Sequence, residues 1–111
     1  MKHVTFADKS LLMGDDAADT LLEYARLIAD THHADSVTLS SISTDGNTVD
    51  ASFLLNSNTV LVTESTNSDV EPPDNRAAVR DLQDRIDSIT RPVTAQAEPP
   101  WAESDYDFPD L

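Results

Sequence analysis

The fold is organised around one stretch, Asp15 to His33, which reads DDAADTLLEYARLIADTHH. Its apolar residues recur at spacings of three and four, which places them along one side of a helix and the charged residues along the other. These apolar positions are Ala18, Leu21, Leu22, Ala25, Ile28 and Ala29. Gly14 interrupts the preceding segment, and Asp15 or Asp16 can accept hydrogen bonds from the first free N–H groups. We therefore predict an amphipathic helix that needs a covering layer.

The neighbouring segments predict that layer. His3–Ala7 (HVTFA) alternates polar and apolar residues and predicts a short strand, whereas Ser10–Met13 (SLLM) predicts an apolar connection leading to the helix. Three alternating segments after the helix predict further strands, at 36–43, 48–55 and 59–64. Asp45-Gly46 between the first two is a typical hairpin turn, because glycine tolerates a positive φ. We expect these three strands to form an antiparallel meander, with the first strand added at an edge or between strands.

A second amphipathic helix is predicted from Asp74 to about Thr90, and Arg91-Pro92 ends it because the residue before proline disfavours the helical conformation. The resulting order, β-α-β-β-β-α, predicts an α+β fold in which an antiparallel sheet and two helices on one face form a two-layer sandwich. Val60 and Val62 are expected to face the helices. The opposite face is expected to carry polar residues, namely Thr38, Ser40, Asp50, Ser52 and Thr63.

The composition changes after Arg91. Residues 92–111 contain four prolines, five acidic residues and no basic residue. We predict a compact domain over residues 1–91 and a proline-rich acidic tail over residues 92–111, which is expected to be disordered when free. Three of the six aromatic residues lie in the final 11 residues. The ending DYDFPDL resembles the acidic, aromatic-tipped tails by which bacterial single-stranded-DNA-binding proteins recruit partners, and this resemblance implies a docking tail.

The tail is the first candidate binding site. Aromatic side chains buried in a partner's pocket can contribute a few kcal/mol each, and acidic neighbours favour a basic groove on the partner protein. The expected anchors are Trp101, Tyr106, Phe108 and Leu111, and the expected steering charges are Asp105, Asp107 and Asp110. Alternatively, Trp101 folds back onto the apolar surface of the domain itself.

The charge restricts the class of partner. The chain has 21 Asp and Glu against 7 Lys and Arg, a formal net charge of −14. Such a balance opposes binding to nucleic-acid backbones and to anionic membranes. This acidic balance has three possible explanations, namely solubility, adaptation to high salt or a basic partner. Residues 1–91 hold 16 acidic and 7 basic residues, so a second hypothesis is that the domain itself acts as an acidic inhibitor, an immunity protein or a mimic of nucleic acid.

Other features restrict location and chemistry. The chain has no cysteine, no signal-peptide-like apolar run and no uninterrupted apolar stretch of about 18 residues, so we expect a cytoplasmic protein without a membrane span. An exposed edge strand can pair with that of a second copy, which allows a homodimer. No sequence motif predicts a cofactor.

One cluster raises an enzymatic alternative. Asp30, His32, His33 and Asp35 are residue types that bind metals or transfer protons. Adjacent positions on a helix point about 100° apart, so His32 and His33 cannot both face one ion while the helix continues. We therefore predict a non-enzymatic protein without a metal, and keep a metal-dependent enzyme using this cluster as a further alternative.

Overall fold

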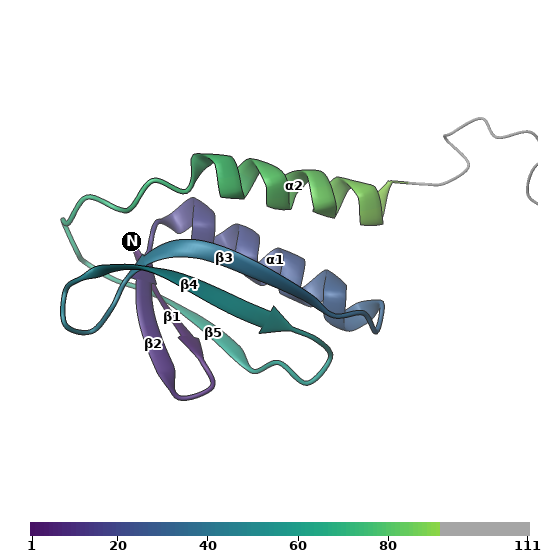
Figure 1. The fold of residues 1–111 in the computed structure, drawn as a ribbon, viewed down its shortest axis with the longest axis horizontal. Helices are drawn as coiled ribbons and strands as arrows, with labels where there is room; N and C mark the ends of the chain where they lie inside the picture. Colours follow the sequence, from purple (N-terminus) through teal and green to yellow (C-terminus); the bar gives the residue numbers. More distant parts are fainter. Residues whose placement is uncertain (92–111) are drawn as a thin grey trace, which may run out of the picture.

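The computed structural model describes residues 1–91, which form a five-stranded antiparallel sheet and two helices (Figure 1). The elements are β1 (Lys2–Phe6), β2 (Lys9–Met13), α1 (Asp15–Asp30), β3 (Asp35–Ile42), β4 (Thr48–Leu55), β5 (Leu61–Ser65) and α2 (Arg76–Thr90). Their order across the sheet is β4-β3-β2-β1-β5. The predicted α+β class is confirmed, although the order of elements contains one more strand than expected.

The additional strand is β2, which replaces the connection predicted at Ser10–Met13. It pairs antiparallel with β1, and the register brings Phe6 opposite Lys9, so Ala7 and Asp8 alone form the turn. Ala7 has a φ of 57°, a value that is uncommon for a residue other than glycine. The prediction was wrong here because this turn lacks the glycine or asparagine that typically marks a tight hairpin.

The predicted three-stranded meander is also wrong. Its first two strands form the expected hairpin, β3–β4, and Gly46 in the turn has a φ of 89°. β5, however, pairs with β1, at the other edge of the sheet from β4. Only residues 56–60 join these two edge strands, so the sheet must bend strongly. Accordingly, the rings of Phe6 on β1 and Phe53 on β4 meet edge to face with centroids 5.5 Å apart.

Because β5 pairs with β1 and not with β4, its side chains point in directions opposite to those predicted. Thr63 lies opposite the fully buried Val4 and therefore faces the helices, whereas we predicted it on the polar face. Val62 and Val60, predicted to face the core, are 48% and 69% exposed. Because side chains alternate along a strand, a shift of one residue in register exchanges the two faces.

The core lies between the sheet and α1. Eight residues of α1 are buried, and the predicted apolar side of the helix is largely correct, although Leu22 is 41% exposed. α2 lies beside α1 on the same side of the sheet (Figure 1), and Leu82 is its one fully buried residue. In the part of the chain that the structure describes, neither helix is long and apolar enough to cross a membrane.

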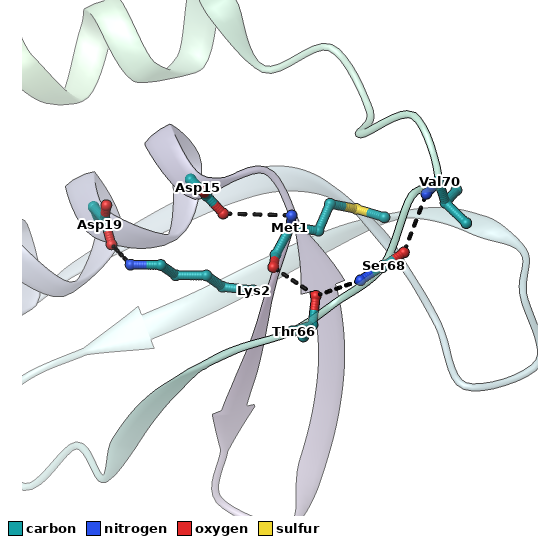
Figure 2. A network of polar contacts seen from close by, with 7 residues as sticks. All are labelled: Met1, Lys2, Asp15, Asp19, Thr66, Ser68 and Val70. Carbon is teal, nitrogen blue, oxygen red and sulfur yellow. Dashed lines mark hydrogen bonds and ion pairs between the residues drawn. The ribbon is translucent and has the colours of Figure 1, made fainter.

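Polar contacts tie the start of the chain to two other segments (Figure 2). The amino group of Met1 lies 3.4 Å from an Asp15 carboxylate oxygen, and Lys2 Nζ lies 2.6 Å from Asp19 Oδ1, so β1 is joined to the first turns of α1. The Thr66 hydroxyl donates a hydrogen bond of 2.7 Å to the Met1 carbonyl. The segment just after β5 is therefore held beside the start of β1.

Candidate functional site

The candidate site begins at a part of β3 that has no partner strand on one side within residues 1–91. β2 pairs with β3 at a single position, Leu12 opposite Ile42, and then turns into α1. The pairing found within residues 1–91 therefore leaves the earlier part of β3 without a strand on that side, while β4 pairs with its other side over the full length. Exposed N–H and C=O groups on a strand edge are available to another chain segment.

The side chain of Asn75 occupies part of this edge. Its Oδ1 accepts a hydrogen bond of 2.8 Å from the Ser40 N–H, and its Nδ2 donates one of 2.8 Å to the Ser40 carbonyl. The side-chain amide thus supplies the acceptor and the donor that a neighbouring strand would supply. Because the direction of backbone groups alternates along a strand, the N–H and C=O of Thr38 point to the same side as those of Ser40.

A groove of about 530 Å³ lies between this edge and the first half of α2. It is lined by Thr38, Ser40, Asp50, Asp74, Asn75, Arg76, Ala77, Ala78 and Arg80. Two arginines and two aspartates give the lining a formal charge of zero, although residues 1–91 carry −9 in total. The groove is therefore a local exception to the acidic character of the domain.

The two arginines of the groove differ in their partners. Arg76 donates two hydrogen bonds of 3.0 Å to the Asp74 carboxylate, and this contact lowers the pKa of Asp74 to about 2. Arg80 forms no ion pair with any other residue in the range 1–91. Arg80 is therefore the cation of the groove that is available to an incoming carboxylate.

A second polar cluster joins α2 to the start of β3. Arg85 Nη1 lies 2.8 Å from Asp35 Oδ2, and Arg85 Nη2 lies 2.8 Å from Asp81 Oδ2. The Tyr24 hydroxyl also donates to Asp35, and this hydrogen bond holds the pKa of that carboxyl below its usual value. Burial raises the pKa of Tyr24. With Asn75 near Ser40 and Arg85 near Asp35, α2 runs antiparallel to β3.

The histidine and aspartate cluster considered for metal binding is not assembled. Asp30, His32 and His33 are exposed, and Asp35 is engaged by Tyr24 and Arg85. His32 has a φ of 56° and lies just beyond the end of α1. Within residues 1–91, no three His, Asp or Glu side chains lie close enough together to hold a metal ion.

The carboxylates at the start of α1 do not cap it as we expected. The N-cap residue is Gly14, and no side chain among residues 1–91 donates or accepts a capping hydrogen bond at this end of the helix. Asp15 instead pairs with the amino group of Met1. Asp15, Asp16 and Glu71 line a larger cavity of about 1000 Å³, and Arg76 and Arg80 border both this cavity and the groove.

The predicted partner-binding residues lie outside the described residues, namely Trp101, Asp105, Tyr106, Asp107, Phe108, Asp110 and Leu111. Conversely, no sequence pattern predicted the groove or the role of Asn75 and Arg80 in it. An asparagine just before a helix is also typical of a cap, so its sequence position alone does not reveal a contact with β3.

No family model, curated protein or solved structure matches this chain. The function is therefore inferred from the charge and the geometry described above.

Proposed function

We propose that this protein is a small, acidic, non-enzymatic module that binds a basic protein partner. One observation carries the proposal: nine of the sixteen carboxylates in residues 1–91 form no ion pair within that range. Four of the seven basic residues are already paired, namely Lys2, Arg26, Arg76 and Arg85. The unpaired negative charge would accelerate encounter with a basic partner.

In this proposal the tail makes the specific contact. Trp101, Tyr106, Phe108 and Leu111 are the apolar anchors, and the acidic residues between them steer the tail into a basic groove. Large aromatic side chains in a partner's pocket supply most of the binding energy of such contacts, whereas charges outside the pocket mainly raise the association rate.

A second candidate places the contact on the folded domain, which would then act as an acidic inhibitor, an immunity protein or a mimic of nucleic acid. The observation that favours it is the position of unpaired carboxylates on the second helix. Asp84 and Asp87 are exposed on α2 and form no ion pair within residues 1–91. Binding through such charges weakens steeply as salt rises.

The test is capture of partners by the immobilised full chain from a native lysate of the source cells, with elution by rising salt. The double variant Trp101→Ala/Phe108→Ala removes two anchors, and Asp84→Asn/Asp87→Asn removes two charges of the domain. Thr48→Ala, an exposed change on β4, is the control.

We expect a basic protein to bind the native chain and the control, and to be lost at least tenfold with the anchor variant. Loss with the Asp84 and Asp87 variant alone would favour the second candidate. If no basic protein is captured, or if both double variants capture it as well as the native chain does, the proposed function is wrong.

A further inference from the structure

We propose that the groove between β3 and α2 is a docking site for this chain's own acidic tail, residues 92–111. The inference rests on the proposed function of the tail as a docking segment and adds its regulation: the domain and the partner compete for the same segment. Three properties of the chain support it, namely reach, charge and the direction of backbone groups.

The tail is long enough to reach the groove. α2 ends at Thr90, and its rise of about 1.5 Å per residue places Arg80 about 15 Å and Arg76 about 21 Å back along the helix axis. An extended chain covers about 3.3 Å per residue, so about seven residues return to the level of Arg76. The segment from about residue 98 onward, which contains the aromatic and acidic positions, can therefore lie beside the groove.

The groove repels the tail less than the domain as a whole does, because its lining is formally neutral. The tail carries five acidic residues and no basic residue, and it would be repelled by a domain of formal charge −9. In the groove it would meet Arg80, which has no ion-pair partner within residues 1–91; Asp50, on the β4 side of the same lining, has none there either. Repulsion from more distant carboxylates is screened over about 8 Å at physiological ionic strength.

The backbone of β3 offers a second means of recognition. Asn75 already binds the N–H and C=O of Ser40 as a neighbouring strand would, and the equivalent groups of Thr38 face the same side. An extended peptide can pair with such an edge. Residues 101–108 (WAESDYDF) contain no proline, and in an extended chain their acidic residues at 103, 105 and 107 fall on one side. Returning along α2, this segment would run parallel to β3.

Trp101 gives a direct readout because it is the one tryptophan in the chain. We would measure quenching of its fluorescence by acrylamide in the full chain, with no partner present. Arg80→Glu reverses the charge in the groove. Lys9→Glu is the matched control, because Lys9 is also exposed and forms no ion pair within residues 1–91, but lies at the β1–β2 turn.

We expect the quenching constant to rise at least twofold with Arg80→Glu, because the indole is released to solvent, and to stay unchanged with Lys9→Glu. Arg80→Gln should give a smaller rise in the same direction, and it replaces the charge reversal if that variant unfolds. Equal quenching in the native chain and both Arg80 variants would overturn the proposal, and so would an equal rise with Lys9→Glu.

This outcome is separable from that of the proposed function. Loss of partner capture with the anchor variant, combined with unchanged quenching in the Arg80 variants, would overturn docking in the groove and leave the proposed function standing. A rise in quenching in the Arg80 variants would support docking in the groove even if no basic partner is captured.

Discussion

The two helices have nearly the same length and similar amphipathic patterns, yet they contribute differently to the fold. α1, with 16 residues, buries eight of them, whereas α2, with 15 residues, buries only Leu82. α1 lies against the bent sheet, while α2 packs mainly on α1 and is held to β3 by polar contacts at its start, Asn75 with Ser40, and in its second half, Arg85 with Asp35. An apolar pattern therefore predicts a helix, but its place in the layers determines its burial.

The largest effect is expected in α1. Leu21 is fully buried, so Leu21→Ala would leave a cavity in the core, and we expect the free energy of unfolding to fall by about 3–5 kcal/mol. Urea denaturation measures this loss. Leu22→Ala, one residue along and 41% exposed, is the control and should cost less than about 1 kcal/mol. Equal losses for the two variants would contradict the burial pattern of α1.

A smaller loss is expected from the corresponding change in α2. Leu82 is also fully buried, but α2 lies at the periphery and can shift to fill part of the space, so Leu82→Ala should cost about 2–4 kcal/mol. Hydrogen exchange should show faster opening of α2 amides than of α1 amides in this variant. If the amides of both helices exchange at the same rate, α2 is as integral to the core as α1, and the two helices do not differ in their contribution to the fold.

A still smaller loss of stability is expected when the polar contact between α2 and β3 is removed. Asn75→Ala leaves the Ser40 N–H and C=O without their side-chain partners, and we expect a loss of about 1–3 kcal/mol in urea denaturation. Asn58→Ala, a change at an exposed turn residue, should alter the free energy of unfolding by less than about 0.5 kcal/mol. If Asn75→Ala lowers the free energy of unfolding no more than the control does, water replaces the hydrogen bonds of the side-chain amide without loss of stability.

The smallest effect concerns pH. The hydrogen bond from Tyr24 lowers the pKa of Asp35 below its ordinary 3.8, so the ionised carboxylate stabilises the folded state at neutral pH. This contribution is lost as the pH falls below about 3.8 through the folded-state pKa. Because Asp35 is partly exposed, Asp35→Asn should cost less than about 1 kcal/mol at pH 7.

Urea denaturation at pH 7 and at about pH 3 would measure this dependence. The difference in the free energy of unfolding between the native chain and Asp35→Asn should narrow at the lower pH. A difference that is constant with pH would show that ionisation of Asp35 does not stabilise the attachment of α2.

The sequence predicted those elements that rest on local patterns. Both helices and the β3–β4 hairpin with Gly46 in its turn were found, because periodicity and turn chemistry are properties of neighbouring residues. β2 was missed because its turn uses Ala7 at a positive φ instead of glycine. The side-chain direction of β5 was wrong because it depends on pairing with β1, more than 50 residues earlier in the chain.

The candidate site was less predictable than the fold. The groove depends on β3 pairing with β2 only at its last residue, Ile42, and on a loop that brings Asn75 to Ser40. Neither feature leaves a periodic pattern in the sequence. The acidic and aromatic composition of the tail, by contrast, is readable directly, and its proposed binding role rests on that composition alone.

By itself, the sequence determined the α+β class, the amphipathic helices, the tight turn at Gly46 and the acidic balance, because these follow from composition and from spacings of two to four residues. Only the tertiary structure decided the strand order, the outward direction of Val62 and the edge of β3 that has no partner strand within residues 1–91. These features depend on which segments pair although they lie far apart in the sequence. The stability of such a pairing comes from both segments together, so the pattern within one segment does not predict its partner.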